Sequence, residues 1–303
     1  ETYMLTAILR ADGSSSLAPG NRWVYYPSFS AGWVVSNEKF MESTKSWMDF
    51  LKLRAGWGEN GNSNSLDAFA YQATFAYDAY SNYSFNNTKD SYTRGASPSR
   101  LANTDLKWET SEQIDLGFDA RFLANRLGVT FDWYNKKTKD LILYVPVDPT
   151  TGFAKQLQNA GTVVNKGVEI ALDWHDKIGE DFSYNVGWNL AYNHNEVTKV
   201  KSSKKYNDGG NDLLAQNTGI MARFEEGHPI GYFYGYKTAG VIQNATDLQN
   251  YITNNCSGSA ANSLQGSSLK PGDLKFVDVN GDGKITAADK TDLGNPHPDV
   301  TMG

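Results

Sequence analysis

Oxygen-bearing side chains near the end of the chain have the spacing of a calcium-binding loop. In DVNGDGKITAAD, residues 278 to 289, an oxygen ligand is available at every ligand position of the EF-hand template, and Gly283 stands at its turn. Calcium is a hard cation that takes roughly six to eight oxygens. The sequence therefore predicts a structural Ca2+ site. Its ligands are Asp278, Asn280, Asp282, Lys284 through its backbone carbonyl, Thr286 and Asp289.

The alternative for this segment is a loop built from Asx turns, because Asp-Gly and Asn-Gly are common turn dipeptides. The match at every ligand position favours the ion, although Asp289 has a shorter arm than the usual glutamate. The surrounding sequence is polar, so we expect an extended loop with little apolar surface of its own, which the ion would make rigid. Cys256, in NNCSGSAANS, is predicted to be a loop thiol.

Catalytic constellations are not predicted. The four histidines are widely separated, and no zinc spacing, GxSxG elbow, P-loop or GxGxxG is present. Glu109, Glu112 and Asp115 could suggest a glycosidase pair. Residues three apart on a strand point to opposite faces, however, so they indicate a polar wall instead. We expect that the protein is not an enzyme.

Two aromatic segments could contact a ligand. YQATFAYDAYSNYSF and GYFYGY both lie in expected loops, where aromatic rings could stack on sugars or peptides or could bind a partner protein. The sequence does not separate these two uses. The candidate residues are Phe75, Tyr77, Tyr80, Tyr83, Phe85, Tyr232 and Tyr234.

The elements that would position these residues are strands. Seven segments alternate apolar and polar residues with a period of two, which is typical of half-exposed strands. Several are longer than the strands usual in soluble sheets. The segments lie within 1–12, 29–36, 51–60, 113–122, 127–134, 168–175 and 182–193.

A soluble sandwich could also alternate in this way, but three features favour a membrane barrel. The polar face is charged along its length, tryptophans stand near strand ends, and connections alternate between tight hairpins (FLANRLG, DKIGEDF) and long loops (58–107, 145–166, 198–296). The expected fold class is all-β: about seven to eight strands of a larger antiparallel transmembrane β-barrel with long extracellular loops. The predicted lumen-facing residues are Lys52, Arg54, Asp115, Asp119, Arg121, Asp132, Glu169 and Asp173.

Composition narrows the possible partners. The chain has 303 residues, a net charge of −6 and a single cysteine. It has no clustered basic patch, so we expect no nucleic-acid binding, and one cysteine excludes an internal disulfide. No run of apolar residues is long enough for a transmembrane helix. Both chain ends fall inside strand-like patterns, so we expect a fragment or processed piece of something longer.

Several stretches resemble a known family in the family's own order. They are RADGSSSLAPGNRWVYYPSFSAGWVVSNEKFM, LKLRAGWGENGN, NTDLKWETSEQIDLGFDARFLANRLGVTFDWYNKKTKDLIL, NAGTVVNKGVEIALDW, EEGHPIGYFYGYKTAGVIQN and PGDLKFVDVNGDGKITAADKTDLGNPHPDVTMG. They look like the later part of the barrel of SusC-like TonB-dependent transporters of Bacteroidetes outer membranes. The resemblance implies a barrel of about 22 strands around a plug, a SusD-like surface lipoprotein as its lid, and nutrient uptake driven by TonB.

On this resemblance, residues 1–303 are a partial barrel in the bacterial outer membrane, without plug, signal peptide or final strands. Residues 198–296 form a long extracellular connection that contains the calcium-type loop. The implied partners are the lipoprotein, outer-membrane lipid, an oligosaccharide or peptide substrate, and the TonB complex through N-terminal parts absent from this chain. The alternatives are a secreted calcium-dependent carbohydrate-binding or scaffold β protein and a passive porin-like channel.

Overall fold

The computed structural model describes residues 1–77, 95–202, 205–209 and 220–303. The chain divides into two compact units. The first comprises Glu1–Lys205 with Pro298–Gly303, and the second comprises Tyr206–His297. The second unit has nearly the bounds of the long connection expected over 198–296. Within the described residues, no helix combines the length and apolar composition needed to cross a membrane.

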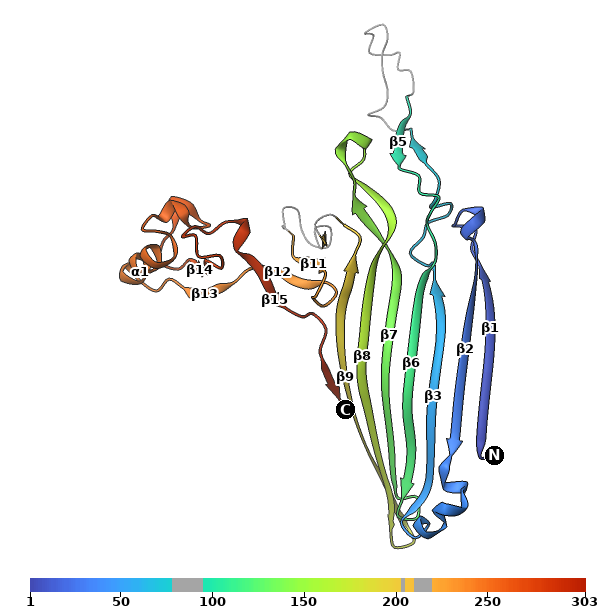
Figure 1. Cartoon of the computed structure of the whole chain (residues 1–303). Helices are drawn as coiled ribbons and strands as arrows, with labels where there is room; N and C mark the ends of the chain where they lie inside the picture. The colour runs from blue at the N-terminus through green and yellow to red at the C-terminus, as the bar shows by residue number, and fades with distance from the viewer. Residues whose placement is uncertain (78–94, 203–204, 210–219) are drawn as a thin grey trace. The chain divides into compact units, whose positions relative to one another are not determined.

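The first unit is built on one eight-stranded antiparallel sheet, which confirms the predicted fold class (Figure 1). The strand order is β1-β2-β3-β6-β7-β8-β9-β16, so the long strands pair with their sequence neighbours. A separate two-stranded sheet, β4 (Thr74–Ala76) with β5 (Ser97–Arg100), lies in the connection from β3 to β6. The eight strands are β1 (Tyr3–Gly13), β2 (Trp23–Val34), β3 (Met48–Asn62), β6 (Glu109–Phe122), β7 (Leu127–Pro146), β8 (Lys155–Ile178), β9 (Phe182–Val200) and β16 (Val300–Met302).

The β7–β8 hairpin is longer than the alternation predicts. β8 has 24 residues, and Val145 on β7 pairs with Gln156 on β8 inside the stretch expected to be a loop, 145–166. The expectation of a long loop there is wrong. A strand that continues beyond an apolar layer keeps its hydrogen-bonded partner but no longer needs one apolar face, so period two disappears from the sequence while the strand persists.

The pairing register gives the sheet two chemically different faces. Antiparallel partners directly opposite each other project from the same side. Leu53 on β3 lies opposite Phe118 on β6, which lies opposite Phe131 on β7, while their immediate neighbours include Arg54 and Asp119. Large apolar side chains on one face are exposed, and their exposed fractions reach 84% at Leu5. This face has no partner within the described chain.

The two tight hairpins form as predicted. The β6–β7 turn occupies 123–126, and the β8–β9 turn occupies 179–181. Leu123, Ala124 and Asn125 all have positive φ angles, and the Asn125 N–H donates to the Asp49 carboxylate at 2.9 Å. The medium connection from β2 to β3 contains two 3-10 helices, Val35–Asn37 and Lys39–Thr44.

The second unit has its own secondary structure. A four-stranded sheet has the order β10-β11-β12-β15, and a two-stranded sheet joins β13 and β14. Among its described residues is one α-helix, α1, which begins where the Asn244 side chain accepts a hydrogen bond from the Asp247 N–H at 3.0 Å. The elements are β10 (Tyr206–Gly209), β11 (Ala222–Glu225), β12 (Tyr232–Tyr236), β13 (Thr238–Val241), α1 (Ala245–Asn255), β14 (Leu274–Phe276) and β15 (Lys290–Gly294).

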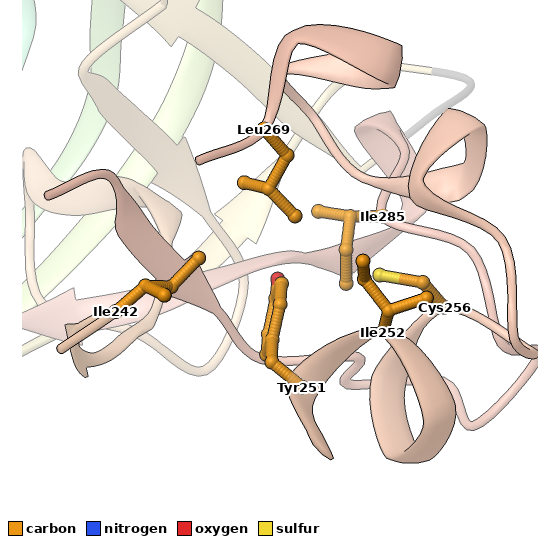
Figure 2. Packing of buried hydrophobic residues seen from close by; sticks show 6 residues of the cluster. All are labelled: Ile242, Tyr251, Ile252, Cys256, Leu269 and Ile285. Atoms are coloured by element: carbon orange, nitrogen blue, oxygen red, sulfur yellow. The ribbon is translucent and has the colours of Figure 1, made fainter. Parts of the chain in front are cut away.

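This unit buries an apolar core, so the expectation of a polar loop with little apolar surface is wrong. Figure 2 shows six buried side chains from α1 and the surrounding segments pointing toward one another. Cys256, expected to be a loop thiol, is 0% exposed and belongs to this core. Leu248, Tyr251, Ile252 and Cys256 have the spacing of an apolar helix face, a signal that the strand-based analysis of the sequence did not use. The six buried core residues are Ile242, Tyr251, Ile252, Cys256, Leu269 and Ile285.

Candidate functional site

A charged network crosses the polar face of the first unit. Arg54 on β3 donates from Nε to Asp119 on β6 at 2.8 Å and from Nη2 to Asp132 on β7 at 3.0 Å. The Arg54 side chain is 35% exposed and its two partners are 34% and 28% exposed, so all three remain accessible to water. The network therefore joins three adjacent strands without removing their charges from solvent.

Glycines make room for these carboxylates. Gly117 lies opposite both Arg54 and Asp132 in the pairing register. A Cβ atom there would lie 2.2 Å from Asp132 Oδ1, and one at Gly128 would lie 2.1 Å from Asp173 Oδ1. Two aspartates thus lie across positions where only glycine leaves space.

The structure places all eight residues predicted to face a lumen on this one face. Lys52 lies opposite Asp119, and Asp132 lies opposite Glu169. A pocket of about 360 Å3 forms where β1, β2, β3, β6 and β7 run side by side, with Lys52 and Asp132 among its lining residues. Contact between these residues and a substrate remains a prediction. The set on this face is Lys52, Arg54, Asp115, Asp119, Arg121, Asp132, Glu169 and Asp173.

The predicted calcium loop is folded tightly on its own acidic side chains. Asp278 accepts hydrogen bonds from the backbone N–H groups of Gly281 and Gly283, both at 2.7 Å. Gly283 makes the predicted turn with a φ of 76°. Asp289 accepts from the Thr286 N–H at 2.7 Å, and these two residues form a capping box at the 3-10 helix Ala287–Asp289.

Electrostatics favour a charged Asp289. The residue is fully buried, and burial alone would raise the pKa of its carboxyl group. Backbone N–H donors of Thr286, Val279 and Asn280 point at the carboxylate and outweigh that effect, so its pKa lies below the ordinary value. The loop therefore contains a buried anion that the surrounding backbone stabilises.

The loop residues fit a calcium ion in part. The carboxyl groups of Asp278 and Asp289 are close enough to affect each other, and both accept hydrogen bonds from backbone N–H groups of the loop. Asp282 instead accepts from the Lys284 N–H at 2.8 Å and from the side-chain amide of Asn280 at 3.1 Å. Over the described ranges, no group of three or more His, Cys, Asp or Glu side chains is placed to hold a metal ion. The predicted Ca2+ stays a prediction, since local hydrogen bonds account for the loop's conformation.

The first aromatic segment is described only in part. Phe75 on β4 and Tyr77 just after it are 59% and 75% exposed, so their rings are available to a ligand or partner. The other candidates of this segment, Tyr80, Tyr83 and Phe85, lie outside the described residues.

The second aromatic segment packs within its own unit. Tyr232 is 2% exposed and its hydroxyl donates to Glu225, so its ring is not available to a substrate or partner in this structure. The Arg223 guanidinium lies over two aromatic rings. Its central carbon is 3.5 Å from the ring centre of Tyr234 and 3.8 Å from the ring centre of Tyr206. Burial and the Glu225 carboxylate both raise the pKa of Tyr232. Sequence reasoning missed this cluster because its members come from separate strands.

A polar cavity of about 660 Å3 lies in the first unit and was also not predicted. Its walls combine the extended start of β8 with the segment 102–107 that precedes β6, and it carries amide and lysine side chains. The Asn159 amide donates to the Lys107 carbonyl at 2.8 Å and thereby ties the two walls together. The polar lining residues include Asn103, Lys107, Gln156, Gln158, Lys199 and Lys201.

The eight-stranded sheet has an exposed apolar face on one side and a charged face on the other. This arrangement is typical of a portion of an outer-membrane β-barrel. Residues 1–272 match the family described as "TonB dependent receptor-like, beta-barrel". The chain therefore belongs to the TonB-dependent receptor β-barrel family, whose members lie in the outer membrane.

Curated relatives support the SusC-like resemblance. The chain is 33% identical over 303 residues to TonB-dependent receptor P3 of Formosa agariphila, covering 99% of this chain and 28% of the relative. It is 32% identical over 306 residues to TonB-dependent receptor SusC of Bacteroides thetaiotaomicron, with 99% and 28% covered. The chain thus spans only 28% of the length of these relatives.

Solved structures show the same fold. The RagAB peptide transporter has a TM-score of 0.65 at 28% identity, over 79% of this chain and 24% of the other. The RagAB peptide importer in its "closed-closed" state has a TM-score of 0.72 at 24% identity, over 99% of this chain and 29% of the other. At this coverage, the chain corresponds to a part of a larger barrel.

Proposed function

We propose that this chain forms part of an outer-membrane nutrient importer and has no catalytic role. The observation that carries the proposal is the single eight-stranded sheet with one exposed apolar face and one charged face. In a closed barrel the apolar face contacts lipid, and the charged face lines a polar lumen through which a hydrophilic substrate passes. Family membership supports the same assignment.

Energy for import comes, in this proposal, from the TonB complex acting through parts of the protein outside this chain. A plug would be rearranged and the substrate would then move along the lumen face that includes Arg54 and Asp132. Uptake of a fluorescent substrate should stop when the proton motive force is dissipated. Uptake that continues at the same rate would instead identify a passive porin-like channel, the runner-up function.

The substrate class in this proposal is an oligosaccharide or a peptide. Exposed rings at Phe75 and Tyr77 can stack on either, and the amide-rich cavity offers hydrogen bonds to either. The RagAB importers that share this fold act on peptides. Uptake of labelled peptides and labelled oligosaccharides by the same cells, compared with a deletion strain, would separate the two classes. If the deletion strain took up both labels as fast as the parent strain, the proposal would be contradicted.

A SusD-like surface lipoprotein is the proposed partner, as SusC-like membership favours. The test is extraction of the protein from outer membranes in detergent, followed by mass spectrometry of co-eluting proteins. A lipoprotein in one-to-one ratio is the expected result. The secreted calcium-dependent alternative predicts a protein that stays soluble without detergent and brings no lipoprotein, a result that family membership argues against.

Calcium binding by residues 278–289 is a further part of the proposal. The match of the loop to the ligand template supports it, and the adjacent carboxyl groups of Asp278 and Asp289 offer a starting pair of ligands. Calorimetry of the folded protein should show binding at millimolar Ca2+ that Asp278→Asn abolishes. The absence of any binding heat at that concentration would reject the ion and leave the loop as a hydrogen-bonded turn.

A further inference from the structure

The apolar face of the first unit ends at a defined row of side chains on its last strands. Trp133 on β7 lies opposite Val168 on β8, Val168 lies opposite Tyr192 on β9, and Tyr192 lies opposite Val300 on β16. Tyr192 is 43% exposed and Val300 is 53% exposed. Aromatic residues at this position are typical of the girdle where a barrel leaves the hydrocarbon layer.

The next row on the same face is polar and cationic. Asn135, Lys166 and His194 follow the girdle at intervals of two residues and lie opposite one another in the register. Residues two apart on a strand share a face, so this row continues the apolar surface directly. Trp133, Tyr192, Val168, Lys166 and His194 together line a cavity of about 420 Å3.

The Lys166 ammonium group is available to bind an anion in this cavity. Within the described part of the chain, its exposed side chain has no ion-pair partner, whereas Lys139 further along is paired with Glu112 at 2.5 Å. His194 lies 3.7 Å from Glu196, which is the one carboxylate ion-paired with this row among the described residues. The row therefore presents an uncompensated ammonium beside an imidazole.

A buried polar atom belongs to the same row as the two basic side chains. The side-chain oxygen of Asn135 is buried without a hydrogen bond within the described residues. Such an oxygen costs free energy unless a donor reaches it. Asn135 is not among the residues that line the cavity, so the polar contacts to a ligand there come from Lys166 and His194.

We propose that this cavity binds the phosphate-bearing headgroup of an outer-leaflet lipid. It lies at the end of the apolar rows that points away from the tight turns 123–126 and 179–181, and the side opposite the short turns faces the outside in outer-membrane barrels. Acyl chains would pack on the rows below Trp133 and Tyr192, while the phosphate would meet Lys166 and His194. Free phosphate shares the chemistry of the headgroup but gains nothing from the adjoining apolar rows, so we assign the site to lipid. This site is distinct from the transport function proposed above.

The test uses the protein purified from outer membranes in mild detergent. Native mass spectrometry would count retained phosphorylated lipid in the wild type and in the double variant Lys166→Gln with His194→Gln. A matched control is Lys136→Gln, because Lys136 pairs with Asn165 on the opposite face at the same height. We expect at least about a fivefold loss of retained lipid in the double variant and no loss in the control, since one lysine near a membrane surface contributes an affinity factor of about five.

Heat-dependent gel migration would verify that each variant is folded. Should the double variant fail to fold, exchange of the wild type against the same lipid without phosphate supplies a second readout, and weaker binding of that lipid is expected. Equal retention by the wild type and the folded double variant would overturn the proposal, as would equal binding of the lipid without phosphate. Inorganic phosphate that binds as tightly as the lipid would identify a free-phosphate site and overturn the lipid assignment.

Discussion

At the scale of single residues, the charged face depends on Arg54. The guanidinium is a planar fork that meets Asp119 through two contacts and Asp132 through two more, so one cation is shared between two anions on neighbouring strands. Because these side chains remain about one-third exposed, the network adds little to stability. Its more important property is a fixed pattern of charge facing a substrate path.

A double-mutant cycle on Arg54→Gln and Asp132→Asn tests how much the ion pair between these residues contributes to stability. We expect a coupling free energy of only about 0.5–1 kcal/mol, because water screens partly exposed ion pairs. The measurement is urea unfolding of the lipid-reconstituted protein. Lys52→Gln, on the same face but without an ion-pair partner among the described residues, is the control and should leave stability unchanged. A coupling of several kcal/mol would show that the network is a structural core.

Asp289 carries a fully buried charge in the second unit. Its folded pKa lies below the ordinary value of 3.8, so the anion stabilises the folded unit above that pH. Stability should therefore be constant at neutral pH and fall as the pH drops through the folded pKa. Hydrogen exchange of residues 278–289 at stepwise lower pH would follow this loss. Asp289→Asn should remove the acid dependence and lower stability by about 1–3 kcal/mol at pH 7.

At the scale of strands, the sequence predicts one face well and strand ends poorly. Ile114, Leu116 and Phe118 alternate with polar residues because one side of β6 must be apolar, so both strand and faces could be predicted. The start of β8 could not, because Gln156 and Gln158 carry no apolar alternation where the strand has left the apolar layer. The polar cavity at that position was missed for the same reason.

Glycine spacing on the polar face gives an element-scale prediction. At Gly117 a methyl group would lie 2.6 Å from the Phe131 backbone carbonyl as well as against Asp132, so Gly117→Ala must push β6 and β7 apart. Gly187, on the same face of β9, has nothing within 4 Å of such a methyl group and is the matched control. We expect Gly117→Ala to cost about 1–3 kcal/mol and Gly187→Ala to cost far less. Thermal unfolding in detergent measures both, and equal effects would contradict the packing described for Gly117.

At the scale of the whole molecule, the chain contains two units that are stabilised by different means. The first exposes its apolar face and depends on a membrane, whereas the second buries an apolar core of its own. The first could be predicted from periodicity and from family resemblance. The second could not, since Ile242 and Ile285 belong to one core yet are far apart in the sequence.

We predict that the two units unfold separately. Because their cores are independent, heating should release hydrogen-exchange protection in 206–297 at a temperature where β6–β8 are still protected. Hydrogen-exchange mass spectrometry across a temperature series, with the protein in detergent, measures both in one sample. A single temperature at which all peptides lose protection together would show instead that the two units form one cooperative structure.

The buried sulfur of Cys256 provides a built-in reporter for the second unit. It is the single thiol of the chain, it is 0% exposed, and burial raises its pKa, so the reactive thiolate is scarce while the unit is folded. An alkylating reagent can therefore modify it only when the core opens. Labelling rate in intact cells would then report how often this unit opens in its native membrane, with no engineered probe and no interfering signal from the strands of this chain.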